Sequence, residues 1–315
     1  MCGLEILYII NFLILSIYFG TNSVYNLENG KGDGNMKKIA VISDLSGLGK
    51  CSLSAALPVI SAAGAQCCPI TTAVLTNQTG YDSYFCRDLT DTIDNYTQQW
   101  DAIGFVPDAV LTGYMASEEQ IDKVITLVKH YKEKGSTIIV DPVMADDGEL
   151  YKDYSHRMCI KMQELCAQAK VITPNLSELC ILCGISFNEI SSSPNIVKRV
   201  EKAAAGLLND VLKLVVVTGI FTDGCVYTMT VGKDKTYLVK NKKYSSGFSG
   251  TGDIFSALFT VLYIKGFSVK YCLNKTVRFI MKSVKKTKAG CSYSPDGTDF
   301  EHCLKMLTKN KITKR

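Results

Sequence analysis

The residues best suited to chemistry are a glycine-rich run that ends on an aspartate, Gly250-Thr251-Gly252-Asp253. The apolar stretch from Ile254 to Ile264 follows at once, which predicts that the run opens a helix. Glycines let a ligand approach the backbone closely, and the first amides of a helix point outward at the positive end of its dipole. Such a turn binds anions, and an aspartate beside it could act as a base. An ordinary helix cap is the structural alternative.

Three further carboxylates follow predicted strands. Asp141 and Asp146 come at the end of the strand 137–141, and Glu178 comes shortly after the strand 171–174. In open α/β sheets, ligands bind at the carboxyl ends of the strands. Carboxylates there could hold Mg²⁺, usually through water. An Asp-Gly turn with solvated acids and a helix capping box are the structural alternatives for these segments.

The segment from Asp44 to Ser52 resembles a phosphate-binding loop, but it does not match the required pattern. A P-loop needs glycine at the position of Asp44 and Ser or Thr at the position of Cys51. The dinucleotide-binding fingerprint needs glycine at the position of Ser52, which disfavours a Rossmann oxidoreductase. We therefore interpret this segment as a flexible substrate loop.

Strands and helices alternate along the chain and must position these residues. Apolar, β-branched runs predict buried strands, and stretches with apolar residues at helical spacing predict helices between them. Gly64 is expected to close the first helix, and Ser117 with Gln120 to form a capping box for a later one. The predicted strands are 38–43, 67–75, 108–114, 137–141, 171–174 and 212–218, with a hairpin of 226–231 and 236–240; the predicted helices are 53–63, 117–134, 156–169, one opening at Asn175 and two near the C-terminus.

Continuous apolar strands with helices between them imply an α/β fold with a mostly parallel central sheet that helices cover on both faces. The 315 residues, 47% hydrophobic and 21% charged, suffice for a large core. The net charge of +5 is modest, and the lysines of the helix 269–286 are interpreted as a solvated face. Nucleic-acid binding is not expected, because no aromatic platform accompanies these lysines.

The thirteen cysteines do not suggest a disulfide framework. Several stand inside apolar helical patterns, where free cysteine behaves as a small hydrophobic residue. The pair Cys180 and Cys183 has no second pair at zinc-site spacing, and the chain has three histidines. Reduced thiols and a cytoplasmic location are therefore expected.

The N-terminal residues 1–35 form an apolar run followed by a polar, glycine-rich stretch. No basic residues precede the apolar run, unlike in a signal peptide, and the run is short for a membrane span. Residues 31–33 can be encoded as a bacterial ribosome-binding sequence upstream of Met36, so an untranslated leader read in frame is favoured over a membrane anchor. The expected organisation is this extension, a single kinase domain over 36–308 and a basic tail over 309–315.

Taken together, the motifs resemble the ribokinase-like superfamily, and within it the vitamin B6 branch of pyridoxal and pyridoxamine kinases. The resemblance runs from about Lys37 to about Leu307, and the order and spacing of the motifs make it specific. The substrate loop is similar to that of the bacterial pyridoxamine kinases. The motifs are 250–253, 141–146, 173–178, 111–117 and 72–79.

The resemblance implies a three-layer α/β/α sandwich, usually a homodimer, and ATP-dependent phosphorylation of the 5′-hydroxymethyl group of pyridoxal, pyridoxamine or pyridoxine. Asp253 would be the catalytic base, and the amides of Gly250, Thr251, Gly252 and Asp253 an anion hole. Mg²⁺ is implied and a monovalent cation such as K⁺ is left open. The residues carried over by position are Asp44, Thr79 and Tyr114 for the vitamin, Thr173, Asn175, Thr218 and Gly219 for the nucleotide, and Asp141, Asp146 and Glu178 for the metal.

Two departures from the family pattern bear on substrate preference. Ser43 replaces a histidine expected before Asp44, and Ala145 occupies a position that is often glycine. A hydroxymethylpyrimidine (phosphate) kinase of thiamine synthesis is therefore kept as the alternative function. A non-catalytic vitamin or nucleotide binder is disfavoured, because such a protein has no need of Asp253.

Overall fold

The computed structural model describes residues 36–243, 248–287 and 296–308. The predicted extension 1–35 and tail 309–315 lie outside these residues, as do the first two residues of the stretch Ser246–Asp253. The predicted domain boundaries therefore stay predictions. No helix in the described ranges is both long and apolar enough to cross a membrane.

A nine-stranded sheet forms the centre of the described chain, in the order β11-β10-β9-β8-β5-β4-β1-β2-β3. The six strands from β9 to β2 in this order pair in parallel, and β10, β11 and β3 are antiparallel additions at the two edges. The strands are β1 (Lys38–Ser46), β2 (Gln66–Leu75), β3 (Cys86–Asp88), β4 (Ala109–Thr112), β5 (Thr137–Val140), β8 (Val171–Ile172), β9 (Leu214–Thr222), β10 (Cys225–Gly232) and β11 (Thr236–Lys242).

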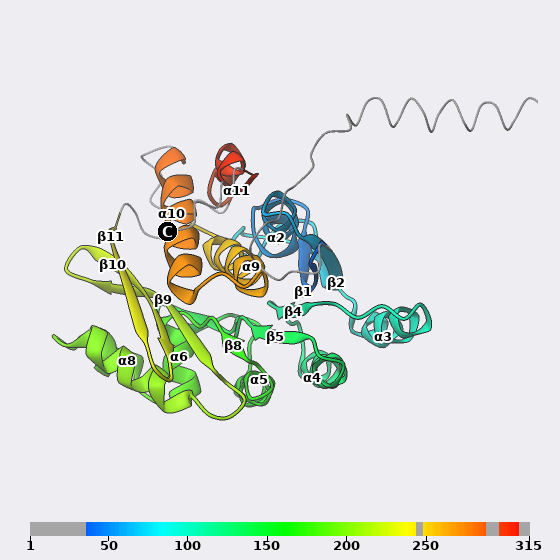
Figure 1. Cartoon of the computed structure of the whole chain (residues 1–315), viewed down its shortest axis with the longest axis horizontal. Helices are drawn as coiled ribbons and strands as arrows, with labels where there is room; N and C mark the ends of the chain where they lie inside the picture. Colours follow the sequence, from blue (N-terminus) through cyan, green and yellow to red (C-terminus); the bar gives the residue numbers. More distant parts are fainter. Residues whose placement is uncertain (1–35, 244–247, 288–295, 309–315) are drawn as a thin grey trace, which may run out of the picture. The chain divides into compact units, whose positions relative to one another are not determined.

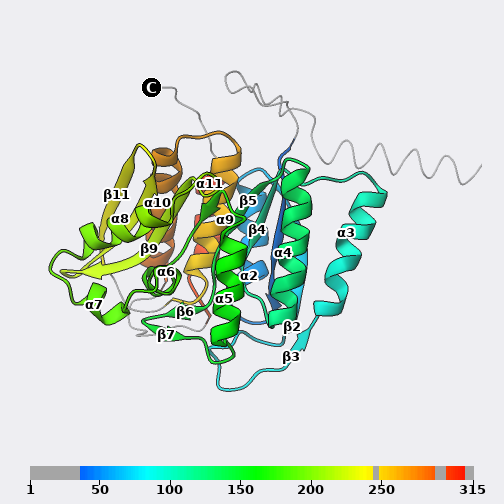
Figure 2. The same ribbon diagram turned by 90° about the horizontal axis from the view of Figure 1, so that it is seen from below.

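Helices cover both faces of this sheet, which confirms the predicted three-layer α/β/α architecture (Figures 1 and 2). One face carries α3 (Ile93–Ala102), α4 (Glu118–Glu133), α5 (His156–Cys166), α6 (Leu176–Cys183), α7 (Phe187–Ser191) and α8 (Ile196–Leu207). The other carries α2 (Ser52–Ala62), α9 (Thr251–Ile264), α10 (Val269–Lys286) and α11 (Lys305–Thr308). Short 3-10 turns, Thr90–Thr92 and Phe300–Cys303, precede α3 and α11.

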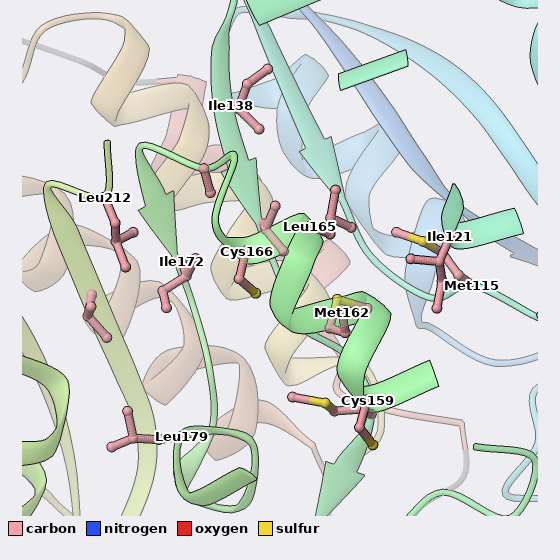
Figure 3. Packing of buried hydrophobic residues seen from close by; sticks show 14 of the residues in the cluster. Met115, Ile121, Ile138, Cys159, Met162, Leu165, Cys166, Ile172, Leu179 and Leu212 are labelled. Carbon is pink, nitrogen blue, oxygen red and sulfur yellow. The ribbon is translucent and has the colours of Figure 1, made fainter. Parts of the chain in front are cut away.

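The central strands are buried on both sides, as continuous apolar runs require. Ile39 and Val41 of β1 belong to one hydrophobic core, and Ala40 and Ile42 belong to the other. Figure 3 shows Cys159 and Cys166 of α5 among Met162, Leu165 and other buried apolar side chains. The described cysteines are free thiols, so those on the helices act as small hydrophobic residues, as predicted.

Most predicted elements lie within a few residues of their expected positions, but β3, α3, α7 and α8 were not predicted. Two further differences concern a loop and a helix cap. The loop after strand 137–141 contains a short hairpin of two strands, β6 (Ala145–Asp146) and β7 (Glu149–Leu150), with two residues each. The capping box at α4 is only half formed: Ser117 Oγ accepts from the Gln120 amide, but Gln120 Oε1 accepts from the amide of Ala116 instead of that of Ser117. The Nε2 group of Gln120 donates to the Thr72 carbonyl of β2. This tertiary contact holds the Gln120 side chain away from the Ser117 amide, with which it would complete the capping box.

Candidate active site

The strands β1, β4, β5, β8 and β9 end at one edge of the sheet because they are parallel. Asp44 lies near the end of β1, Asp141 directly follows β5, and Thr173 directly follows β8. The N-terminus of α9 brings Asp253 to the same edge, where Asp253 and Asp141 line a small cavity together with Ser43, Ser52, Thr112 and Ser256. The fold therefore gathers Asp253 with Asp44, Asp141 and Thr173 at one edge of the sheet, although these residues come from distant parts of the chain.

Asp253 lies in the first turn of α9, which opens after Gly250 in the left-handed conformation with φ of 77°. The residue is partly accessible to solvent. Its carboxylate is nevertheless surrounded closely enough that burial raises its pKa to about 7, and the charges of Asp141 and Asp44 add to this. A hydrogen bond from the backbone amide of Ser52 pulls the pKa the other way. An aspartate of this kind takes up a proton near neutral pH, as a general base must.

The glycines of the turn have two separate roles. A Cβ on Gly250 would lie 1.9 Å from the carbonyl oxygen of Lys50, so no side chain fits there. A Cβ on Gly252 would meet nothing within 4 Å, and this residue is exposed. Gly252 thus borders open space in front of the first amides of α9, where an anion could approach the backbone.

Asp141 is buried and tied into a chain of hydroxyl groups. Ser256 Oγ donates to Asp141 Oδ2 at 2.7 Å, and it lies 2.9 Å from Thr173 Oγ1. Burial raises the pKa of Asp141, while the hydrogen bonds from Ser256 and Thr173 lower it. The hydroxyl of Thr173, which the resemblance assigned to the nucleotide, is therefore turned toward this buried acid.

Glu178 forms the capping box of α6 predicted as the structural alternative. Its Oε2 accepts from the Asn175 amide at 2.8 Å, its Oε1 accepts from the Met144 amide at 3.2 Å, and the Glu178 amide donates to Asn175 Oδ1. Burial raises the pKa of Glu178, and the nearby charge of Asp141 raises it further. Two buried acids that repel each other in this way would be stabilised by a cation.

The three predicted metal-associated acids fit Mg²⁺ held through water better than Mg²⁺ held directly. No three His, Cys, Asp or Glu side chains in the described part of the chain are gathered closely enough to hold a metal ion. Both oxygens of Glu178 already accept hydrogen bonds, and Asp146 is exposed on the β6–β7 hairpin with Oδ1 accepting from the Asp147 amide. Mg²⁺ keeps several of its waters, so second-sphere carboxylates suit it.

Three of the four residues predicted to bind the nucleotide lie side by side: Asn175 follows β8, and Thr218 and Gly219 lie within β9, which continues to Thr222 instead of ending at residue 218 as predicted. Asn175 and Thr218 form an isolated parallel bridge, and the Thr218 amide donates to the Pro174 carbonyl. Gly219 has a φ of 66°, and a Cβ there would lie 4.0 Å from that of Asn175. The structure thus brings Asn175, Thr218 and Gly219 together.

Two of the three predicted vitamin-binding residues lie close to each other. Asp44 is buried, and burial raises its pKa against the opposing hydrogen bonds of Ser52 and Ser46. Burial also raises the pKa of Tyr114, with further contributions from Cys86, Asp153 and Asp44. Thr79 lies on an exposed turn, and no hydrogen bond joins its side chain to Asp44 or Tyr114 among the described residues.

Sequence reasoning missed five residues of this site. Cys86 and Asp153 stand near Tyr114, and Tyr84 donates a hydrogen bond to Asp153 Oδ2 at 2.9 Å. These come from loops and an edge strand without periodic patterns, so no local signal marks them. Ser52 and Ser256 could have been found, because Ser52 ends the substrate loop and Ser256 follows Asp253 by one helical turn.

Comparison with known proteins identifies the class. The sequence model of the phosphomethylpyrimidine kinase family matches residues 49–295, so the chain belongs to that family. Curated relatives that are named pyridoxal kinases confirm the resemblance to the ribokinase-like B6 kinases. The pyridoxine/pyridoxal/pyridoxamine kinase of Bordetella avium is 27% identical over 74% of this chain and 79% of its own, while several other curated relatives are matched over about half of their own length.

Solved structures agree with this assignment. A Bacteroides thetaiotaomicron protein described as a phosphomethylpyrimidine kinase, in a crystal form with pyridoxal, has a TM-score of 0.81 and 30% identity over 87% of this chain and 96% of its own. The pyridoxal kinase of Leishmania donovani in complex with ADP and pyridoxamine has a TM-score of 0.74 at 20% identity, over 87% of this chain and 97% of its own. The second likeness supports the fold alone.

Proposed function

We propose that this protein is an ATP-dependent kinase that phosphorylates the 5′-hydroxymethyl group of pyridoxal, pyridoxamine or pyridoxine. The observation that carries the proposal is the place of Asp253, a partly accessible carboxylate with a raised pKa at an anion-binding helix start. The family of the chain and the pyridoxal in the crystals of its Bacteroides relative support the choice of substrate.

In this reaction Asp253 accepts the proton of the substrate hydroxyl while the oxygen of that hydroxyl attacks the γ-phosphorus of ATP. The amides at the start of α9 stabilise the charge on the transferred phosphoryl group, and ADP leaves. Bound Mg²⁺ supplies neutralisation of phosphate charge, and Asp141, Asp146 and Glu178 would hold it through water. Asn175, Thr218 and Gly219 bind the nucleotide, and Asp44, Tyr114 and Thr79 contact the vitamin ring.

The alternative is a hydroxymethylpyrimidine (phosphate) kinase, which the name of the matching family favours. The same catalytic end serves both substrates, and the ring contacts decide between them. Location in the cytoplasm, a homodimer and the absence of a nucleic-acid partner belong to the proposal as well, and a requirement for a monovalent cation such as K⁺ is left open. So does the division into an extension over 1–35, a kinase domain over 36–308 and a tail.

A substrate panel tests the proposal. The full-length protein is assayed for ADP release with pyridoxal, pyridoxamine, pyridoxine and hydroxymethylpyrimidine, each with ATP and Mg²⁺. We expect turnover of at least one B6 vitamer with a higher kcat/KM than that of the pyrimidine. Preference for the pyrimidine selects the alternative function, and no turnover of any of the four overturns the kinase proposal.

A further inference from the structure

Three segments that are far apart in the sequence meet behind the anion site. The loop 47–52 leads into α2, Ser249 and Gly250 precede α9, and the segment Asp296–Glu301 precedes α11. The Lys50 amide donates to the Asp296 carbonyl at 3.1 Å. This contact joins the substrate loop to the C-terminal segment.

The Lys50 side chain adds a second connection between these segments. Its ammonium group donates to Asp299 Oδ1 at 2.9 Å and to Glu301 Oε2 at 3.2 Å. Burial by itself would lower the pKa of Lys50, but the bonds to Asp299 and Glu301 outweigh it and the net shift is upward. Lys50 therefore stays charged at neutral pH, with two carboxylates as its partners.

The backbones of the three segments pack without side chains between them. A Cβ on Gly297 would lie 2.9 Å from the Ser249 carbonyl oxygen and 3.0 Å from Lys50 Cβ, and a Cβ on Gly250 would overlap the Lys50 carbonyl. Both glycines have positive φ. Because contact is this close, a displacement of the loop at Lys50 must displace the glycine turn or break the contact.

The position of Lys50 matters for the base because Ser52 follows two residues later. Ser52 and Asp253 line the same small cavity, and an interaction of the Ser52 amide with the Asp253 carboxylate lowers the pKa of Asp253. Ser52 has a φ of 48°, a left-handed conformation that a residue with a side chain rarely adopts. Such a conformation persists only where the surroundings hold it, so the contacts of Lys50 bear on the geometry of Asp253.

We propose that Lys50 is a positioning residue for phosphoryl transfer: its pairing with Asp299 and Glu301 holds the loop 47–52 against the glycine turn, so that the Ser52 amide orients the Asp253 carboxylate. This inference rests on the proposed function, in which Asp253 is the base. The competing account is that Lys50 binds a phosphate of ATP directly, as the lysine of a P-loop does.

Steady-state kinetics of the full-length protein separate the two accounts. Three variants are compared: Lys50→Met, the pair Asp299→Asn with Glu301→Gln, and all three changes together. We expect each to lower kcat about three- to fivefold, since half-exposed ion pairs are weak, with KM for ATP changed less than twofold. The triple variant should lose no more than the worse of the other two, because all three break one contact. Lys50→Arg keeps the positive charge, so it should retain most of the kcat of the unchanged protein.

The competing account predicts shifts of KM for ATP in opposite directions. Removing Lys50 would then raise KM for ATP, and removing its two carboxylate partners would free the lysine and lower KM for ATP. That pattern overturns the positioning role.

Amide hydrogen exchange provides a readout that needs no substrate. Peptides that cover 47–52 should exchange faster in Lys50→Met and in the variant without its two acidic partners than in the unchanged protein. The matched control is Lys161→Met, which breaks the pair with Asp122 (2.6 Å) at a similar exposure, 24% for Lys161 and 29% for Lys50. Unchanged exchange over 47–52 in Lys50→Met overturns the inference. Failure of the kinase proposal would appear as an absence of turnover in the substrate panel and would not change the exchange result.

Discussion

Asp253 meets two requirements that usually oppose one another. A base must reach the substrate, so it cannot be fully covered, yet it must bind a proton near neutral pH, which requires removal from water. The start of α9 leaves the residue partly accessible, while the loop before α2 and the charges of Asp141 and Asp44 surround its carboxylate. The local chemistry therefore comes from three separate parts of the chain.

Replacement of this carboxylate is the most direct test at the residue scale. Asp253→Asn keeps the shape and removes the base, so kcat should fall by about 10²- to 10⁴-fold with ATP binding retained. Single-turnover phosphoryl transfer and nucleotide titration measure the two effects. Asp94→Asn, in the first turn of α3, is the matched control and should leave kcat unchanged. Near-native activity in Asp253→Asn would show that the base is elsewhere.

The same variant should be more stable than the unchanged protein at pH 8. The pKa of Asp253 is higher in the folded protein than the ordinary value of 3.8, so the charged form opposes folding above pH 7 and this cost disappears as the pH falls toward 4. Each pKa unit corresponds to about 1.4 kcal/mol. Thermal unfolding should give a Tm several degrees higher for the variant at pH 8, with a smaller difference at pH 5.5.

The pH profile of kcat/KM should have an acidic limb. With a pKa of about 7, mainly because of burial, Asp253 becomes protonated and inactive below neutrality. We expect kcat/KM to fall about tenfold per unit well below pH 7. The Asp44→Asn variant should move this limb to lower pH, because the charge of Asp44 contributes to the shift. A limb that stays in place in that variant would be due to another group.

At the scale of elements, the start of α9 depends on two glycines with different surroundings. Gly250→Ala places a Cβ 1.9 Å from the Lys50 carbonyl at a φ of 77°, and overpacking of this kind costs about 1–3 kcal/mol. It should lower both Tm and kcat. Gly252→Ala meets no neighbour, so Tm should be unchanged while KM for ATP or kcat suffers from a methyl group in the anion site. Equal Tm losses in both variants would contradict this division.

The start of α6 allows a similar test of stability. Asn175 caps this helix through the Glu178 amide and also donates to the Ala145 carbonyl at 2.7 Å. Asn175→Ala should therefore cost about 1–2 kcal/mol, which denaturant unfolding measures. Asn195→Ala is the matched control, because Asn195 stands at the same position before α8 without a side-chain cap. A loss in Asn195→Ala as large as that in Asn175→Ala would contradict the capping role.

At the scale of the whole molecule, the sequence predicts most of the sheet and the edge that carries the site. The strands β1, β4, β5, β8 and β9 contain apolar runs. Asp44 lies near the end of β1, and Asp141 and Thr173 directly follow β5 and β8, so a parallel sheet must gather these three residues. The capping box at Asn175 was also predictable, because its contacts lie within one helical turn.

Contacts between distant segments could not be predicted in this way. Gln120 leaves the expected box for the Thr72 carbonyl of β2, which lies 48 residues earlier. Asp153 joins Tyr84 across 69 residues, and Asp299 joins Lys50 across 249. No local periodicity carries such information, because it depends on how the loops at the edge of the sheet pack together.

Removal of residues 1–35 tests the predicted boundary of the kinase domain. The family match begins at residue 49 and the described structure at Met36, so a chain that starts at Met36 should keep kcat within about twofold and an unchanged Tm. The full-length protein is the control. A large loss of activity in the shortened chain would mean that the extension contributes to the folded enzyme.

The pairing of Lys50 with Asp299 also sets an order of events during protein synthesis. Ribosomes add about 5–20 residues per second, so about 12–50 s separate the appearance of these two residues. Over that interval the sheet and most helices can form, but the loop before α2 lacks its C-terminal partners. A nascent chain whose residues Asp296–Glu301 have not yet left the ribosome should therefore be folded in its central layers and still be a poor catalyst.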